Sequence, residues 1–405
     1  MSEHVVIVGA SHAGAGAASA LRQVGFAGAI TLIGDEGVAP YHRPPLSKAY
    51  LSGELDREAL LLRPEESYAD ADISLRLGER VGAIELDDKT VQLDSGERIA
   101  WDRLVLATGA RVRKLPVPGA ELPGVHYLRD TADVEAIRER VKPGAPAVII
   151  GGGYIGLETA ASLTKLGMAV TLLEAQDRIL QRVTSEVMSD FYREVHEEHG
   201  VAIKEGCIAS AIREEGEGLM VDTSCGQSLP AHLVVIGIGV IPNSELAEFA
   251  GLSVGNGIEV DQHCQTSHPD VFAIGDVAEQ RSALYGRDVR IESVPDATEQ
   301  AKTVARFITG TPKPHDALPW FWSDQFDLKL QIAGLSDGHD EVLLRGEPST
   351  RSFAAYYFRG ERLLAVDAVN APRDFMTARM ALGRGKTLDK AVLADPESDL
   401  KAALR

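Results

Sequence analysis

The chain is poor in cysteine, and none of its cysteines forms a recognisable redox or metal-binding pair. Only three occur in 405 residues, Cys207, Cys225 and Cys264, and no two stand in a Cys-x-x-Cys spacing. We therefore expect each to be a buried or incidental thiol rather than a redox or metal-binding residue. The eleven histidines show no metal-ligand spacing either. His196 and His199 lie three apart on an acidic predicted helix, where we expect them to be solvated, and we assign no metal.

Long apolar runs and a charged-then-apolar leader are also missing, since Met1 to His4 runs directly into a predicted strand. We therefore expect neither secretion nor a membrane span, and a cytoplasmic location. Positive charge is scarce: 41 lysines and arginines face 60 acidic residues, for a formal net charge of −19. This balance argues against general affinity for nucleic acid or anionic membranes.

What the sequence does contain is two glycine-rich turns, each between a strand and a helix. The first follows a strand predicted at 5–8 and runs from Gly9 through Ser11 and Ala13 to Gly14, into an alanine-rich helix over about 13–24. In such a turn the glycines allow a tight bend, close approach of the backbone to a pyrophosphate, and packing of the helix on its strand. The helix N-terminus favours the negative phosphates.

The second turn repeats this arrangement. It follows a strand predicted at 147–150 and runs from Gly151 to Glu158, into a helix over 154–166. An acidic residue follows the next strand in both units, Asp35 or Glu36 in the first and Glu174 in the second, where a carboxylate binds the ribose of a dinucleotide. Alternatively, Asp35 and Glu36 are only turn residues of a solvated loop. Two such units predict a flavin in one site and a nicotinamide in the other.

Strands and chain breakers divide the sequence into three predicted domains. After the second unit, the chain returns to the first through a strand at 271–274 that ends in Gly275 and Asp276. The FAD-binding domain is therefore predicted to be discontinuous, residues 1–112 and 240–318, with the NADH-binding domain, residues 113–239, inserted in it. Alternating strands predict a C-terminal α+β domain with an antiparallel sheet, residues 319–405. The predicted fold class is α/β, with two Rossmann-like domains plus this third domain.

Five motifs in this order resemble one family. They are Arg43-Pro44-Pro45-Leu46-Ser47-Lys48, Leu106-Ala107-Thr108-Gly109-Ala110, the turn from Gly151 to Glu158, Ala273-Ile274-Gly275-Asp276 and Pro319-Trp320-Phe321-Trp322-Ser323-Asp324-Gln325. Together they resemble the NADH-dependent ferredoxin reductases of bacterial cytochrome P450 and aromatic-ring dioxygenase systems, the putidaredoxin-reductase-like proteins. That family has the glutathione-reductase-type FAD fold without its redox disulfide. The resemblance covers essentially the whole chain and implies FAD and NADH as cofactors.

The glycine turns, the strand ends and the resemblance together give the expected cofactor residues. For FAD they are Gly9, Ser11, Ala13, Gly14, Asp35, Glu36, Arg43, Pro44, Lys48, Val81, Ala107, Thr108, Gly109, Arg129, Gly275, Asp276, Val294 and Trp322. For NADH they are Gly151, Gly153, Tyr154, Ile155, Gly156, Glu158, Glu174, Gly237, Ile238 and Gly239. Ser11 departs from the family, which usually has glycine there. Its hydroxymethyl group either crowds the pyrophosphate or donates to it, and we expect FAD to bind after a small backbone adjustment.

Lys48 and Glu158 are the expected catalytic residues. Disulfide-containing relatives carry a cysteine-bearing helix where this chain has residues 44–47, so no thiol can relay electrons and the reduced flavin itself must be the donor. We hypothesise that Lys48 reaches the flavin N5 region and pairs with Glu158 of the nicotinamide domain, which requires both buried partners to be satisfied. Otherwise Lys48 is a surface residue of a helix. Glu174 predicts NADH rather than NADPH, because its charge repels a 2′-phosphate.

The resemblance also implies a partner, a small acidic [2Fe-2S] ferredoxin that binds transiently and electrostatically. An acidic reductase must bind it through a local basic patch, for which Arg63, Lys302 and Lys329 are candidates. A rubredoxin reductase would use the same residues. An NADH oxidase or peroxidase, or a disulfide reductase, is disfavoured by the lack of cysteine in residues 43–48. A flavoprotein that binds nucleic acid is disfavoured by the acidic charge.

Overall fold

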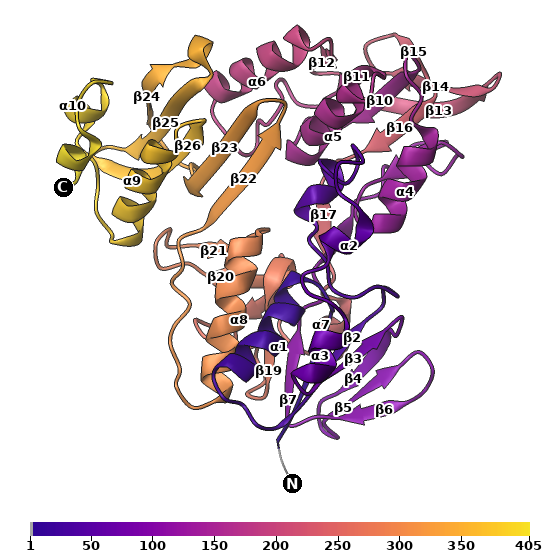
Figure 1. Cartoon of the computed structure of the whole chain (residues 1–405), viewed down its shortest axis with the longest axis vertical. Helices are drawn as coiled ribbons and strands as arrows, with labels where there is room; N and C mark the ends of the chain where they lie inside the picture. Colours follow the sequence, from indigo (N-terminus) through magenta and orange to yellow (C-terminus); the bar gives the residue numbers. More distant parts are fainter. Residues whose placement is uncertain (1–2) are drawn as a thin grey trace. The chain divides into compact units, whose positions relative to one another are not determined.

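A computed structural model describes residues 3–405, which fold into two compact units (Figure 1). The first unit comprises residues 3–42, 60–111 and 241–319, and the second comprises residues 43–59, 112–240 and 320–405. The short segment 43–59, which we expected in the FAD-binding domain, belongs to the second unit. The regions expected as NADH-binding and C-terminal domains lie together in that unit. The chain passes from the first unit to the second through β8 (Ala110–Val112) and returns through β17 (Val240–Pro242).

The first unit is built on a five-stranded parallel sheet. Its strands, in the order β19-β7-β1-β2-β3, are β19 (Val271–Ala273), β7 (Arg103–Leu106), β1 (His4–Val8), β2 (Ala29–Gly34) and β3 (Ile73–Leu77). Most of these residues, except in β3, are buried, because helices pack on one face of the sheet and short strands pack on the other. Helices α1 (His12–Gln23) and α8 (Val294–Ile308) pack against each other over one core cluster with Ile7 and Phe272.

Smaller elements complete the first unit. An antiparallel sheet contains β4 (Val81–Glu85), β5 (Thr90–Leu93) and β6 (Arg98–Ala100), and another small sheet contains β18 (Ile258–Val260), β20 (Ala278–Arg281) and β21 (Asp288–Val289). Its short helices are α3 (Glu66–Asp70) and α7 (Glu245–Phe249), and the chain re-enters the unit at the last residue of α2 (Arg57–Leu60).

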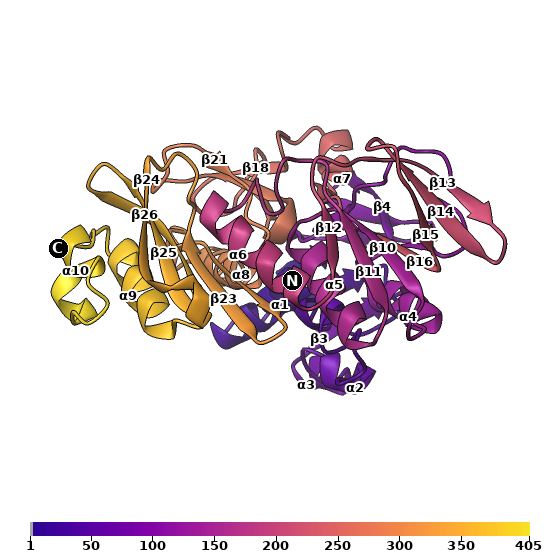
Figure 2. The ribbon, with the colours of Figure 1, turned by 90° about the horizontal axis from the view of Figure 1, so that it is seen from above.

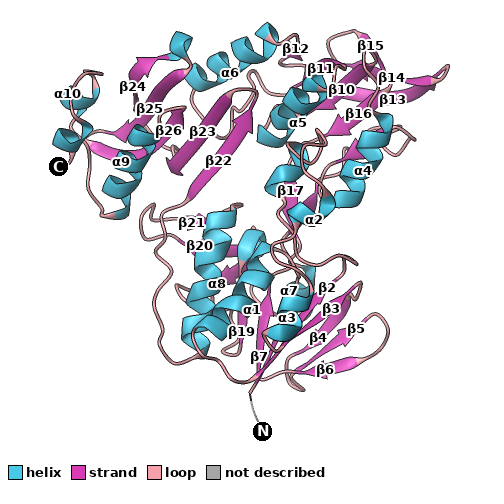
Figure 3. Cartoon of the chain, in the orientation of Figure 1, coloured by secondary structure: helices cyan, strands magenta, loops and turns pink. Residues whose placement is uncertain are grey.

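The second unit contains a parallel sheet of the same kind, drawn with its helices in Figure 3. The strand order is β12-β11-β10-β16-β9, with β12 (Ala202–Lys204), β11 (Ala169–Leu173), β10 (Pro146–Ile150), β16 (Leu233–Ile236) and β9 (Val125–Tyr127). Its helices are α4 (Thr131–Arg140), α5 (Tyr154–Lys165) and α6 (Glu186–Glu198), and an antiparallel sheet contains β13 (Ala209–Glu215), β14 (Gly218–Thr223) and β15 (Ser228–Ala231).

The C-terminal part of this unit is the predicted antiparallel sheet. Its order is β22 (Trp320–Gln325), β23 (Leu328–Gly334), β26 (Arg362–Val369), β25 (Ser352–Arg359) and β24 (Glu341–Glu347). Successive side chains of β25 point to opposite faces. The Phe353 ring contacts Phe191 of α6, whereas the Tyr356 hydroxyl donates to Asp374 of α9 (Pro372–Gly383). The sheet therefore lies between α6 and α9 (Figure 2). Helix α10 (Lys390–Leu393) follows near the C-terminus.

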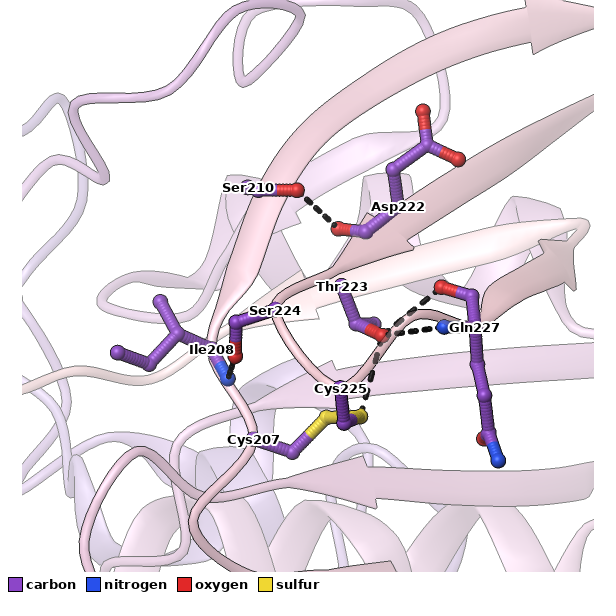
Figure 4. Close-up of a disulfide and its surroundings, with 8 residues drawn as sticks. All are labelled: Cys207, Ile208, Ser210, Asp222, Thr223, Ser224, Cys225 and Gln227. Carbon is purple, nitrogen blue, oxygen red and sulfur yellow. Dashed lines mark hydrogen bonds between the residues drawn. A yellow bond between two sulfur atoms is a disulfide. The ribbon is translucent and has the colours of Figure 1, made fainter.

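Two expectations about single residues were wrong. Cys207 and Cys225 form a disulfide (Figure 4), and only Cys264 is a buried free thiol. His196 is fully buried instead of solvated, with its Nε2 atom 2.8 Å from Oε1 of Gln325. Its burial lowers its pKa to about 4, so the imidazole is neutral near pH 7. Within residues 3–405, no helix is long and apolar enough to cross a membrane.

Candidate active site

The first glycine turn lies at the carboxyl end of β1. Gly9 has a φ of +113°, and a Cβ atom there would lie only 2.1 Å from the carbonyl oxygen of Ala107. A Cβ on Gly14 would lie 1.9 Å from the carbonyl oxygen of Gly9. Only glycine allows this approach of the turn to the neighbouring strand and of α1 to the turn. Ser11 is the N-cap residue of α1, and Ala13 is buried in its first turn.

This turn stands at the point where the strand order of the sheet reverses. Strand β2 lies on one side of β1 and β7 on the other, which is where open α/β sheets bind ligands. Thr108 and Gly109 follow β7 at the same edge. The Thr108 hydroxyl donates to the carbonyl oxygen of Asn243 (2.7 Å), and the Asn243 amide donates to the carbonyl oxygen of Thr108 (2.9 Å). Asn243, which the sequence did not single out, therefore fixes this loop.

The other FAD residues expected in the first unit lie in several elements. Asp35 is exposed just after β2, whereas the Glu36 carboxylate accepts a hydrogen bond from the Tyr41 hydroxyl (2.6 Å). The buried Gly275 donates its N–H to Oε1 of Gln300 on α8 (2.6 Å). The remaining expected residues are Asp276, whose carbonyl oxygen accepts from Arg290, Val294, the first residue of α8, and Val81, the buried first residue of β4.

The second glycine turn has the same construction at the reversal point between β10 and β16. Gly151 has a φ of +115°, and a Cβ there would lie 2.3 Å from the carbonyl oxygen of Gly237. A Cβ on Gly156 would lie 1.9 Å from the carbonyl oxygen of Gly151. Gly153 is the N-cap of α5, and a Cβ on it would meet open space. No side-chain hydrogen bond caps this helix N-terminus, so its N–H groups can donate to a pyrophosphate. The residues present thus fit a dinucleotide.

The carboxylate of Glu174 is held beside this turn. It follows β11, and its Oε2 atom accepts the N–H of Gly152 (2.6 Å) while Oε1 accepts the N–H of Gln176 (2.8 Å). Arg178, four residues further on, does not offer a free cation. Its guanidinium donates to Ser189 and to the carbonyl oxygens of residues 181, 184 and 185. Beside the turn stands the carboxylate of Glu174, and the Arg178 guanidinium does not pair with it.

Lys48 and Glu158 form the expected ion pair, with Nζ 2.7 Å from Oε2. Glu158 lies in the first half of α5 and is 1% exposed, whereas the Lys48 side chain is 18% exposed. Lys48 ends a short 3-10 turn, Pro44–Ser47, which begins with two prolines. The pair lies entirely within the second unit. A buried carboxylate is stable only when its oxygens are hydrogen-bonded, and here Lys48 supplies one donor.

Two hydroxyl groups supply the other donors to Glu158. Ser47 donates to Oε2, and Ser323 of β22 donates to Oε1 (2.6 Å). The Gln325 amide donates to the Ser323 hydroxyl (3.1 Å), and its Oε1 atom reaches His196. Sequence reasoning missed the roles of these four residues. The only available signal was that Ser47, Ser323 and Gln325 lie inside motifs that were already noted.

The remaining expected residues also lie in the second unit. An Arg43 guanidinium nitrogen donates to the carbonyl oxygen of Arg129 (2.8 Å), which joins two residues that we expected at the flavin. Pro44 begins the turn before Lys48. Trp322 of β22 lies next to Trp320, with ring centroids 5.7 Å apart. Tyr154 and Ile155 open α5, and Ile238 and Gly239 follow β16.

Comparison with known proteins agrees with this geometry. Residues 3–301 match the family described as pyridine nucleotide-disulphide oxidoreductase, and residues 320–404 match the family described as reductase C-terminal. The chain is 45% identical over 401 residues to rhodocoxin reductase of Rhodococcus erythropolis, covering 99% of this chain and 94% of that protein. It is 44% identical over 399 residues to the 5,5'-dehydrodivanillate O-demethylase ferredoxin reductase subunit of Sphingobium sp., covering 98% and 97%.

A solved structure shows the same fold. The reductase chain in the crystal structure of the covalent putidaredoxin reductase–putidaredoxin complex superposes with a TM-score of 0.96, at 44% identity and 99% coverage of both chains. Two parallel sheets, each with a glycine turn at its reversal point, are the construction of a protein that binds two dinucleotides, and the matching family makes it an oxidoreductase. The chain belongs to the pyridine nucleotide-disulphide oxidoreductases and, within them, to the ferredoxin reductases of oxygenase systems. This family membership implies a flavin and a pyridine nucleotide as cofactors.

Proposed function

We propose that this enzyme takes hydride from NADH onto FAD and passes the electrons singly to a [2Fe-2S] ferredoxin, which feeds a cytochrome P450 or a ring-hydroxylating dioxygenase. The observation that carries the proposal is the pair of glycine turns, one in each unit, each at the reversal point of a parallel sheet. Two dinucleotide sites in one chain suit the transfer of hydride from one bound dinucleotide to another. Relatives named for rhodocoxin and putidaredoxin support a ferredoxin as acceptor.

Within the first unit, the turn from Gly9 to Gly14 and the loop at Thr108 and Gly109 would hold FAD. Asp35 would bind its ribose, because Glu36 already accepts the Tyr41 hydroxyl. Within the second unit, the turn from Gly151 to Gly156 would hold the pyrophosphate of NADH, and Glu174 its adenosine ribose. When bound, these cofactors supply the hydride transfer and the subsequent one-electron steps.

Lys48 and Glu158 would orient the reacting groups. The carboxylate holds the Lys48 ammonium through a 2.7 Å ion pair, and Ser47 and Ser323 fix the carboxylate in turn. Such a network keeps a cation in one place. Trp322 would lie beside the reacting ring. Because the Lys48 side chain is already held in position, less activation free energy is needed to reach the reactive geometry.

The ferredoxin would dock on the outer face of α9. Two methionines there, Met376 and Met380, are 55% and 39% exposed, and Arg373 and the C-cap residue Arg384 are exposed at the same helical spacing. Arg379 lies over the Trp320 ring, 4.9 Å from its centroid. An apolar centre with a positive rim on a chain of net charge −19 suits a small acidic partner.

The patch expected from the sequence is less suited to that role. Lys302 is paired with Glu299 of its own helix (2.7 Å), and the Arg63 guanidinium lies 5.5 Å from the Tyr68 ring centroid. Lys329 is exposed on β23. The three candidates are thus separate residues on separate elements.

The test is NADH oxidation by the purified FAD-loaded enzyme, with cytochrome c present, before and after addition of a [2Fe-2S] ferredoxin. We expect a large ferredoxin-dependent rise. The variant Lys48→Met should slow flavin reduction by NADH in an anaerobic stopped-flow experiment while FAD content is unchanged. Fast NADH loss without ferredoxin, matched by oxygen uptake, would instead assign oxidase activity. An unchanged reduction rate in K48M would remove Lys48 from the mechanism.

A further inference from the structure

The disulfide in the second unit lies at a position set by strand register. Ala209 of β13 is paired with Thr223 of β14, so Cys207 and Cys225, two residues beyond each, stand opposite one another. Their Cα atoms are 5.6 Å apart, within the usual range for disulfides. Cys207 is 2% exposed, whereas Cys225 is exposed in the turn between β14 and β15 (Figure 4).

The backbone of Cys207 is joined directly to the expected ribose-binding carboxylate. The N–H of Cys207 donates to the carbonyl oxygen of Glu174 (2.9 Å), and the N–H of Gly206 donates to that of Gln176 (2.8 Å). The Glu174 side chain in turn accepts the N–H groups of Gln176 and of Gly152 in the second glycine turn. Through its own backbone, Cys207 therefore connects the disulfide to the backbone of Glu174, which positions the Glu174 carboxylate.

The segment has other anchors, so opening the disulfide would loosen it without releasing it. Glu205 accepts the N–H of Ile179 (2.8 Å). The Ser224 hydroxyl accepts the N–H of Ile208 (2.9 Å), and the N–H of Ser224 donates to the carbonyl oxygen of Ile208 (2.8 Å). We expect a graded change in nucleotide affinity rather than unfolding.

We propose that Cys207 and Cys225 form a reversible thiol–disulfide site that sets the affinity of the site beside Glu174 for pyridine nucleotide. The proposal rests on the nucleotide site assigned to the second unit above. The disulfide form holds residues 205–208 in place and so preorganises Glu174, which favours binding. The dithiol form leaves this segment more freedom and binds the nucleotide more weakly.

The reductant is a low-molecular-weight monothiol such as glutathione. Its thiolate attacks Sγ of Cys225, the more exposed of the two residues, forming a mixed disulfide and releasing the Cys207 thiolate, which takes up a proton. A second monothiol attacks the mixed disulfide, giving the low-molecular-weight disulfide and the Cys225 thiol. Two electrons pass from two monothiols to one protein disulfide. The reverse reaction uses the low-molecular-weight disulfide as oxidant. Attack at Cys225 rather than Cys207 follows from their exposure.

The test compares the FAD-loaded enzyme after treatment with glutathione disulfide and after treatment with reduced glutathione, both desalted. Mass spectrometry after alkylation under denaturing conditions should count one labelled cysteine in the oxidised protein and three in the reduced one. The Kd for NAD⁺ should be about fivefold higher in the reduced protein, the lower end of typical coupling between linked sites. The variant Cys225→Ser, which lacks the sulfur that the monothiol attacks, should have the reduced value after either treatment.

Either of two results with the wild-type protein would overturn the proposal. One is three labelled cysteines after oxidation, which would mean that the disulfide does not form. The other is an equal Kd for NAD⁺ in the two states. Neither the cysteine count nor the Kd for NAD⁺ depends on ferredoxin. Measuring the ferredoxin-dependent activity of the same samples therefore distinguishes a failure of the redox proposal from a failure of the proposed function. If glutathione still changed the Kd for NAD⁺ in C225S, the change in affinity would not come from the disulfide between Cys207 and Cys225.

Discussion

The Ser323 hydroxyl donates to the Glu158 carboxylate over 2.6 Å, although the two residues are 165 positions apart in the chain. Ser323 is fully buried on β22, and Glu158 is buried on α5. The bond therefore joins the C-terminal sheet to the helix that follows the second glycine turn. Together with Ser47 and Lys48, it satisfies a carboxylate that would otherwise be unstable in this setting.

The first prediction concerns this bond. In Ser323→Ala, Glu158 loses its donor at Oε1, and a lost hydrogen bond to a charged group costs about 1.5–3 kcal/mol. If the bond positions Glu158 for the reaction, flavin reduction by NADH should slow by about tenfold or more. Ser323→Thr keeps the hydroxyl and should retain most of the rate. Stopped-flow absorbance measures both variants, and a wild-type rate in S323A would show that the bond is only structural.

The second prediction concerns the choice between NADH and NADPH. In Glu174→Gln, the side-chain oxygen can still accept the N–H of Gly152, but the negative charge is gone. We expect the ratio of kcat/KM for NADPH to that for NADH to rise by about tenfold, or about 1.4 kcal/mol. Glu174→Ala removes the hydrogen bond as well and should also weaken NADH binding. A ratio unchanged in both variants would mean that Glu174 does not contact the ribose.

The glycine turns could be predicted from the sequence because each is a local requirement. Gly9 and Gly151 need a positive φ and a bare Cα beside the next strand, and both demands are met within one strand–turn–helix segment. The ion pair between Lys48 and Glu158 was expected only through the resemblance. Composition and spacing alone would have left Lys48 as a surface residue.

The supporting contacts could not be predicted because they depend on packing between distant segments. His196 looked solvated on an acidic helix, yet the C-terminal sheet covers it and Gln325 meets its ring. The disulfide required the register of β13 and β14, which places Cys207 opposite Cys225. A single sequence carries no signal for either.

The third prediction concerns the outer face of α9. Replacing Arg373 and Arg384 by Glu reverses the charge of the proposed docking face, so the KM for ferredoxin should rise several-fold, and more at low ionic strength. NADH-dependent reduction of a small acceptor such as ferricyanide should not change. Arg98→Glu, at an exposed position of β6 in the first unit, is the control for altered net charge. An equal effect in R98E would argue for a general electrostatic effect instead of docking at α9.

The last prediction concerns two buried groups whose pKa shifts act in opposite directions. Burial raises the pKa of Asp367 from 3.8 to about 6, although Thr184 and Tyr357 donate to its carboxylate. Between these values the folded state binds more protons than the unfolded state, so Asp367 lowers stability as the pH rises through this window. Burial lowers the pKa of His196 from 6.5 to about 4. There the unfolded state binds more protons, so His196 raises stability as the pH rises.

The contributions of Asp367 and His196 to the pH dependence of stability oppose one another between about pH 4 and pH 6.5. Removing one group should therefore make the contribution of the other visible. In Asp367→Asn the thermal midpoint should rise more steeply with pH than in the wild type, because the opposing contribution of Asp367 is removed and that of His196 is kept. In His196→Gln it should rise less steeply or fall. Scanning fluorimetry at half-unit pH steps measures both slopes. Two variants with slopes parallel to the wild type would show that neither group changes protonation on unfolding, whereas a changed slope in one alone would identify the group that does.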